Sequence, residues 1–215
     1  RSRGRDSVDE GRTVMTGVID YGAGNLFSLT GGIEAAGGEA KVTADEKELA
    51  KCDELILPGV GAFRPAMEKL AAKGLDRFIR DYVRGGGRLL GICLGMQMLL
   101  DSSTEMGGDQ GLGLIPGTVE KIETKLKLPH IGWNSLNIVN PNPLTAGLSD
   151  GDYVYFVHSF CAKVKNAEDL SLTTDYGTTV TAMIARGNVF GCQFHPEKSG
   201  PVGMTILRNF GELTK

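Results

Sequence analysis

Several features that define large protein classes are missing from this sequence of 215 residues. No apolar stretch reaches the roughly 18 residues of a membrane-spanning helix, and nothing near the start resembles a signal peptide. The four cysteines form no C-x-x-C pair, which argues against a zinc site or a redox dithiol. The net charge of −3 gives no sign of the basic surface that nucleic acids or anionic membranes attract. These absences predict a cytoplasmic protein that binds small molecules or other proteins, with no nucleic acid and no membrane partner.

Glycine, by contrast, is abundant, with 31 of the 215 residues, which is roughly twice its average share. Since 41% of the residues are hydrophobic and the glycines follow no collagen period, the composition excludes a disordered chain and a fibre. The glycines are therefore expected in tight turns of one domain over residues 15–215. Residues 1–14, rich in arginine and acids, are expected to be a disordered upstream extension or a segment added in cloning.

The first half of this domain alternates apolar runs, glycine turns and helical patterns. Predicted strands end near Asp20, Thr43, Leu57 and Ile92, and each of the last two leads through a turn into a helical pattern. Strands that alternate with helices form a parallel sheet with helices on both faces. The sequence therefore predicts an α/β fold with a mostly parallel central sheet.

The second half, after about Gly111, changes to β-rich segments. Strands are predicted over residues 118–122, 133–139, 153–160, 170–174, 179–185 and 189–194. A last helix is predicted over about residues 200–213, with apolar residues on one side that can cover the sheet. No repeat or long linker interrupts the chain, which fits a single α/β domain with a β-rich later half.

The strongest local signal is GICLGMQ at residues 91–97, where a predicted strand turns sharply into a helix at Cys93. Glycine two residues before and two after suits such a turn, because larger side chains would collide across it. We expect an exposed Cys93 sulfur whose thiolate is stabilised by the helix dipole, with the Leu94 amide facing a developing oxyanion. A buried structural cysteine explains Cys93 alone equally well, because free cysteines are commonly buried.

A cysteine nucleophile needs a base, and the sequence has three histidines, His130, His158 and His195. His195 directly follows an apolar strand, and Glu197 can orient its ring across the rigid bend of the intervening proline, which completes a Cys-His-Glu arrangement. His158 lies mid-strand among apolar residues and is predicted to be a hydrogen-bonded core or pocket-wall residue. His130 follows a proline and fits a surface position.

With the elbow at residues 91–97 and the HPE segment at 195–197, the sequence resembles the class I glutamine amidotransferases over essentially all of residues 15–215. The resemblance implies a flavodoxin-like α/β fold, no metal, no organic cofactor, and glutamine as the substrate. It implies that Cys93 forms a γ-glutamyl thioester, that His195 transfers the protons and that Glu197 orients His195. It further implies oxyanion donors at Val60, Gly61 and Leu94, and substrate-binding residues at Gln97, Glu105, Ser159 and Phe160. For Glu105, a solvated loop acid is an equal alternative.

Further segments at residues 20–26, 58–63, 129–134 and 155–160 make the sequence similar to the glutaminase subunits of imidazole glycerol phosphate synthase. This similarity implies a heterodimer with a separate (β/α)8-barrel cyclase, and it implies contacts with that partner at Trp133, Tyr155 and Lys198. Core aromatics and a solvated lysine are the alternatives at these three positions. Two other functions remain open, a glutaminase subunit of another synthase such as anthranilate synthase, and a non-catalytic interaction module of the same fold. Relatives of anthranilate synthase tend to have a second proline where this chain has Val60.

The glycine turn at residues 20–25 raises the question of a nucleotide site. The full G-x-G-x-x-G fingerprint is absent, because Phe27 stands at its third glycine position. We therefore expect this turn to pack beside residues 58–61 or beside the partner.

Overall fold

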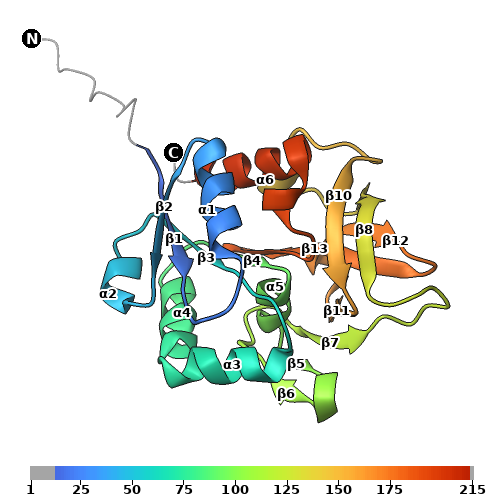
Figure 1. Cartoon of the computed structure of the whole chain (residues 1–215), viewed down its shortest axis with the longest axis horizontal. Helices are drawn as coiled ribbons and strands as arrows, with labels where there is room; N and C mark the ends of the chain where they lie inside the picture. The colour runs from blue at the N-terminus through green and yellow to red at the C-terminus, as the bar shows by residue number, and fades with distance from the viewer. Residues whose placement is uncertain (1–12, 214–215) are drawn as a thin grey trace, which may run out of the picture.

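An eight-stranded sheet, in the order β2-β1-β3-β4-β14-β13-β12-β9, runs through the computed structural model, which describes residues 13–213 (Figure 1). The strands β2 (Glu39–Thr43), β1 (Met15–Ile19), β3 (Glu54–Leu57), β4 (Leu89–Ile92) and β14 (Val189–Cys192) are parallel to their neighbours. The strands β13 (Thr179–Arg186), β12 (Leu170–Asp175) and β9 (Asn137–Ile138) continue the sheet in antiparallel pairs. The predicted α/β class with a mostly parallel sheet and a β-rich later half is confirmed.

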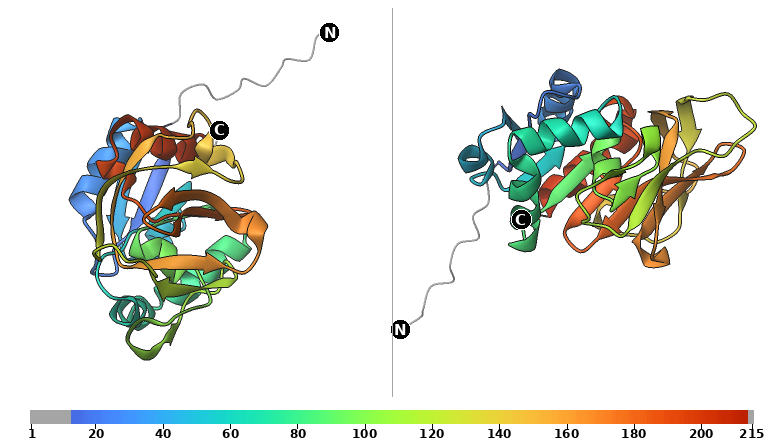
Figure 2. Two further views of the ribbon diagram at one scale, coloured as in Figure 1. Left: turned by 90° about the vertical axis from the view of Figure 1, so that its right-hand side faces the viewer. Right: turned by 90° about the horizontal axis from the view of Figure 1, so that it is seen from below.

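Helices cover both faces of the parallel part (Figures 1 and 2). One face carries α1 (Leu26–Ala35) and α6 (Gly200–Glu212), and the other carries α3 (Phe63–Ala72), α4 (Leu75–Arg84) and α5 (Leu94–Met98). The short α2 (Glu46–Leu49) joins β2 to β3. Each face of the sheet therefore has its own apolar core.

Alternation along the strands divides the residues between these two cores, because successive side chains point to opposite faces. Ile19, Leu55, Leu57 and Leu89 pack with α3, α4 and α5, whereas Val18, Ile56, Leu90 and Ile92 pack with α1 and α6. A strand buried on both faces needs a continuous apolar run, which explains LIL at residues 55–57 of β3 and LLGI in β4.

Two small sheets lie beside the central one (Figure 1). In one, β10 (Tyr153–His158) pairs antiparallel with β8 (His130–Ser135). The other has the order β11-β7-β5-β6, formed by β11 (Phe160–Val164), β7 (Gly117–Lys121), β5 (Ser102–Ser103) and β6 (Asp109–Gln110). Short 3-10 turns complete this half, among them residues 105–107 and 196–198.

Some element boundaries differ from the sequence prediction. The predicted strands at residues 133–139 and 153–160 each divide into two strands of different sheets, which continuous apolar alternation does not reveal because it marks only burial. The helical pattern between Met67 and Tyr82 forms two helices, since Gly74 adopts φ 74° between them. Residues 1–12 of the predicted extension lie outside the described residues. Val14 belongs to the folded domain, because it is buried and its carbonyl accepts a hydrogen bond from Glu39 N at 2.9 Å.

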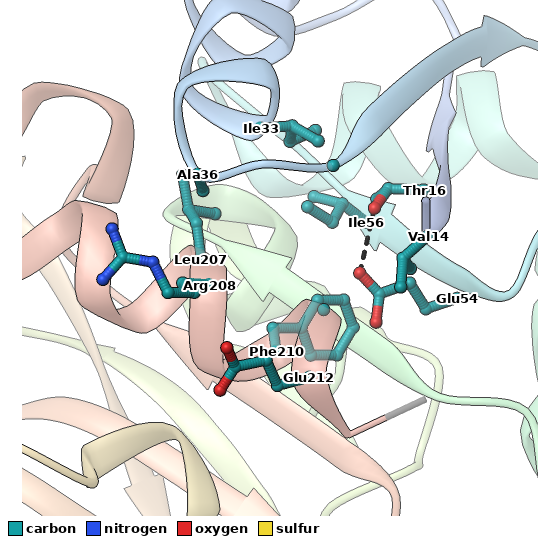
Figure 3. Close-up of a pocket in the computed structure, with 12 residues that line it drawn as sticks. Val14, Thr16, Ile33, Ala36, Glu54, Ile56, Leu207, Arg208, Phe210 and Glu212 are labelled. Carbon is teal, nitrogen blue, oxygen red and sulfur yellow. Dashed lines mark hydrogen bonds between the residues drawn. The ribbon is translucent and has the colours of Figure 1, made fainter. Parts of the chain in front are cut away.

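A buried acid lies at the opposite end of β3 from the glycine turn at residues 58–61. Glu54 is 1% exposed and lines a pocket between the sheet and helices α1 and α6 (Figure 3). Thr16 donates a hydrogen bond of 2.9 Å to Oε1, whereas Oε2 has no hydrogen-bond partner among the described residues. Burial raises the pKa of Glu54 to about 7, although Thr16 and the charge of Arg88 oppose the shift.

We predict that Glu54→Gln stabilises the protein more at pH 8 than at pH 5. The folded state keeps the proton of Glu54 up to about pH 7, whereas the unfolded chain releases it near the ordinary pKa of a glutamate. Wild-type stability therefore falls as the pH rises between these values, and the variant, which does not titrate, avoids about 2 kcal/mol of this loss. Urea unfolding at both pH values measures the difference, with exposed Glu120→Gln as the control. An equal effect of Glu54→Gln at both pH values would contradict the prediction.

Candidate active site

Cys93 is the single residue between β4 and α5, and it has an unusual backbone conformation. Its φ is 56° and its ψ is −113°, a conformation that residues with side chains rarely adopt. The predicted sharp turn from strand to helix is therefore present. At the start of α5 the first backbone N–H groups have no partner within the helix, so they point a partial positive charge at the sulfur and at any bound substrate.

The glycines around Cys93 are required by close contacts, as the sequence pattern predicted. A Cβ on Gly91 would lie 2.7 Å from the carbonyl oxygen of Gly95. A Cβ on Gly95 would collide with the carbonyl oxygen of Leu57 at the end of β3. Neither neighbour is a flexible side chain, so any substitution must displace backbone and move the cysteine.

The prediction that the elbow exposes its sulfur is wrong for this structure. Cys93 is 7% exposed and packs with the apolar core beneath α1 and α6. Gln193, which follows β14, donates a hydrogen bond to the sulfur over 3.7 Å. The sequence showed the local bend but not the residues that other strands bring over it.

His195 and Glu197 meet as predicted. His195 Nδ1 lies 2.9 Å from Glu197 Oε1, and both side chains are buried. Burial lowers the pKa of His195, but the interactions of the ring with Cys93 and Glu197, which favour its charged form, outweigh burial and raise the pKa to about 9. The imidazolium form is thus favoured at neutral pH. The other ring nitrogen, Nε2, is buried without a hydrogen-bond partner of ordinary geometry among the described residues, which leaves it for the sulfur and a substrate.

The backbone of His195 is held by β10. The His195 N–H donates to the carbonyl of Tyr155 at 3.0 Å, and Ser199 Oγ donates to the His195 carbonyl at 2.6 Å. The same hydroxyl accepts from Tyr155 N at 3.0 Å. On the far side, α1 approaches Glu197 through Gly32, where a Cβ would lie 3.1 Å from the glutamate Cβ.

The segment at residues 58–61 passes directly over the elbow. A Cβ on Gly59 would lie 2.8 Å from Gly95 N and 2.8 Å from the Tyr21 hydroxyl. Tyr21 donates a hydrogen bond of 2.9 Å to the carbonyl of Pro58, which confirms that the turn at residues 20–25 packs beside this segment. Gly61 has φ 95°, and Val60 is 46% exposed. The segment is therefore anchored at its first half and open at its second.

The four predicted substrate-binding residues have different surroundings. Gln97 Nε2 donates to the carbonyl of Phe160 at 3.1 Å and to Gln193 Oε1 at 3.0 Å. Ser159 and Phe160 are half-buried at the junction of β10 and β11. Glu105 lies in the turn after β5, where its Oε2 accepts from Phe63 N at 2.7 Å. Glu105 therefore caps α3, so it is not a merely solvated acid.

The two remaining histidines form a buried pair. His130 Nδ1 lies 3.1 Å from His158 Nε2, and His158 Nδ1 lies 2.8 Å from the Phe160 carbonyl. Burial lowers the pKa of His158 to about 4 and lowers the pKa of His130 as well. His158 is a hydrogen-bonded core residue, as predicted. The surface position predicted for His130 is wrong, because its ring stacks between Tyr176 and Phe156 at centroid distances of 4.0 and 4.7 Å.

The predicted partner contacts lie on an outer face of the domain. Trp133 is 55% exposed and meets Tyr155 edge to face at 6.2 Å between ring centroids. Lys198 is exposed in the turn after His195. Since Trp133 and Tyr155 are not fully enclosed, the alternative of ordinary core aromatics is excluded for Trp133 and weakened for Tyr155.

Two residues near the cysteine were missed by the sequence analysis, Gln193 and Tyr21. A signal for Gln193 existed, because it stands two residues before His195 and alternate side chains of an extended strand point the same way. No comparable signal marked the Tyr21 hydroxyl. Among the described residues, no helix is long and apolar enough to cross a membrane, and no group of three or more His, Cys, Asp and Glu residues could hold a metal.

Comparison with known proteins agrees with this geometry. Residues 17–213 match the family described as Glutamine amidotransferase class-I. A protein of Caldanaerobacter subterraneus subsp. tengcongensis, named imidazole glycerol phosphate synthase subunit HisH, is 46% identical over 201 residues, which cover 94% of this chain and 99% of that protein. The protein of the same name from Streptococcus gordonii is 51% identical over 197 residues, which cover 91% of this chain and 94% of that protein.

Solved structures support the fold at much lower identity. PurLQS from Thermotoga maritima superposes with a TM-score of 0.76 at 19% identity, over 95% of this chain and 100% of that chain. A second structure, described as a glutamine amidotransferase, has a TM-score of 0.73 at 21% identity, over 93% of this chain and 98% of that chain. The chain therefore belongs to the class I glutamine amidotransferase family and, within it, to the HisH subunits of imidazole glycerol phosphate synthase.

Proposed function

We propose that this chain hydrolyses glutamine as a subunit of imidazole glycerol phosphate synthase in histidine biosynthesis, and that Cys93, His195 and Glu197 carry out the reaction. The observation that carries the proposal is the cysteine at a strained elbow beside a buried histidine bonded to a glutamate at 2.9 Å. Identity of 46% and 51% with HisH proteins over more than nine tenths of the chain supports this particular synthase.

In the first half of the proposed reaction, the Cys93 thiolate attacks the side-chain carbonyl carbon of glutamine. A C–S bond forms and the carbonyl oxygen takes the electron pair, where the amide of Leu94 and an amide of Val60 or Gly61 stabilise its charge. When the intermediate collapses, the C–N bond breaks and the His195 imidazolium gives its proton to the departing nitrogen. Ammonia leaves and a γ-glutamyl thioester remains.

In the second half, neutral His195 takes a proton from water, whose oxygen attacks the thioester carbon. The C–S bond breaks, glutamate leaves, and the thiolate and imidazolium are restored. Glu197 favours the charged ring, which is consistent with the raised pKa of His195. Gln97, Glu105, Ser159 and Phe160 would hold the substrate.

The ammonia is proposed to be used by a separate cyclase, a (β/α)8 barrel, in a cytoplasmic heterodimer. Trp133, Tyr155 and Lys198 are proposed contacts with it. Support comes from the half-exposed Trp133 next to the strand that holds His195. A non-catalytic module is disfavoured, because a structural cysteine gains nothing from a backbone conformation that costs about 1–3 kcal/mol.

We predict that Cys93→Ala abolishes glutamine hydrolysis and leaves the fold intact. Without the sulfur no thioester can form, and the strained backbone is held by the surrounding glycine contacts. A glutamine-analogue alkylator followed by mass spectrometry identifies the nucleophile, with buried Cys52→Ala as the matched control that should keep both labelling and activity. A dominant adduct at Cys52, Cys161 or Cys192 would overturn the assignment.

We predict that His195→Ala costs more activity than Glu197→Ala. In a comparable triad, loss of the base costs on the order of 10⁶-fold and loss of the orienting carboxylate on the order of 10⁴-fold. Glu197→Gln should also lower the pKa of His195 from about 9, so an imidazole NMR titration should move to lower pH. Near-normal turnover in His195→Ala, together with inactivation by His158→Ala, would show that the base is wrongly assigned.

We predict low glutaminase activity in the isolated chain and activation when the cyclase binds its own ligand. The peptide between Val60 and Gly61 lies in the open half of its segment, so it can rotate to present either N–H or C=O to the substrate. Loss of one oxyanion donor lowers the rate about 10²- to 10³-fold. We therefore expect the liganded cyclase to raise the glutaminase rate by about the same factor. Ammonia release from glutamine is measured with the cyclase absent, present, and present with ligand. Equal rates in all three would refute this switch.

A further inference from the structure

Gln193 is a fully buried polar side chain, at 0% exposure, in contact with the proposed nucleophile. Its Nε2 lies 3.7 Å from the Cys93 sulfur, within the range of a hydrogen bond to sulfur. Its Oε1 accepts from Gln97 at 3.0 Å. Both ends of the amide are therefore used, which is the condition for burying such a group at low cost.

The neighbouring hydrogen bonds fix which end of Gln193 faces the sulfur. Gln97 must direct Nε2 toward the carbonyl of Phe160, because its oxygen would face another acceptor there. The second hydrogen on Gln97 Nε2 then points to Gln193, so the Gln193 atom that accepts it must be Oε1. Nε2 of Gln193 is left facing Cys93, so the sulfur receives a donor.

The pair of His130 and His158 extends the same network, and its hydrogen bonds determine which nitrogen of each ring carries the proton. His158 must carry its proton on Nδ1 to donate to the carbonyl of Phe160, so its Nε2 accepts from His130 Nδ1. His130 Nε2 then accepts from Asn134 Nδ2 at 3.3 Å. Both rings are neutral in this arrangement, which agrees with the lowered pKa of each. The Phe160 carbonyl is thus held from two sides, and Gln97 is held with it.

We propose that Gln193 is a further catalytic residue, whose side-chain amide donates to the Cys93 sulfur and stabilises its thiolate before attack and on release from the thioester. This rests on the proposed role of Cys93 as nucleophile. The imidazolium of His195 stabilises the same thiolate, but its proton leaves with ammonia, whereas the amide donor of Gln193 stays in place throughout the cycle. Gln97, His158 and His130 act as positioning residues for this donor.

Two variants separate the donor from its other contact. Gln193→Met has similar length and removes both hydrogen bonds. Gln193→Glu keeps an acceptor for Gln97 but replaces the donor at the sulfur by a carboxylate oxygen. The amount of thiolate is followed by its ultraviolet absorbance against pH, as the difference between each protein and the same protein carrying Cys93→Ala. This measurement needs no reagent to reach the buried sulfur and no glutamine turnover.

We expect the pH at which half of the thiolate signal develops to rise by about one unit in Gln193→Met, the loss given by one hydrogen bond to a charged group, and to rise further in Gln193→Glu. In glutamine turnover, Gln193→Glu should lower kcat with little change in KM, because Gln97 keeps its partner. The control is Asn142→Leu, which removes another partly buried side-chain amide and its hydrogen bond to Ser171 Oγ. This variant should lower stability without changing the thiolate signal.

The proposal is wrong if both Gln193 variants titrate like wild type while remaining folded by circular dichroism. If Gln193→Met does not fold, Gln193→Glu alone decides, since it keeps the size and the bond to Gln97. A thiolate that depends on Gln193 in a chain without glutaminase activity would contradict the proposed function but support the role of the amide.

Discussion

The positive φ at Cys93 is the constraint on which the rest of the site depends. Turning from β4 into α5 within one residue brings the helix so close to β3 that Gly95 lies against the Leu57 carbonyl. This backbone costs about 1–3 kcal/mol, and burial of Met96 and Met98 in the core against α3 and α4 offsets it. Packing and the backbone hydrogen bonds of Cys93, to the Cys192 carbonyl at 2.8 Å and from Gln97 N at 3.2 Å, maintain the strain without the sulfur, so the sulfur can react without releasing it.

Parallel strands explain how residues far apart in the sequence meet around that sulfur. β1, β3, β4 and β14 are consecutive in the sheet and parallel, so their carboxyl ends lie along one edge. Tyr21 follows β1, Pro58 follows β3, Cys93 follows β4 and His195 follows β14. The turn after each strand contributes one group, and the hydrogen bond from Tyr21 to Pro58 ties two of these turns together. The site is therefore a direct consequence of sheet order.

Sequence reasoning predicted the parts of the site whose geometry is local. Glycines at fixed distances from Cys93 mark the elbow, and a proline between His195 and Glu197 marks the bend that lets them meet. It failed where tertiary pairing decides. His130 is buried where β8 pairs with β10 and where Tyr176 stacks on its ring, and the sulfur of Cys93 is covered in part because β14 lies beside β4 and brings Gln193 to it. The residues next to His130 and Cys93 in the sequence do not indicate which strands pair beside them.

The outer face and the reaction centre share one strand, which limits how a partner can act on the site. Tyr155 lies in β10 beside the exposed Trp133, and its carbonyl accepts the His195 N–H at 3.0 Å. Its amide in turn donates to Ser199, whose hydroxyl also holds the His195 carbonyl. Displacing β10 would therefore move the base, whereas rotating the open half of residues 58–61 changes only the oxyanion donors. A partner that covers Trp133 must keep β10 in register while it acts on the 58–61 segment, because activation gains nothing if the base is lost.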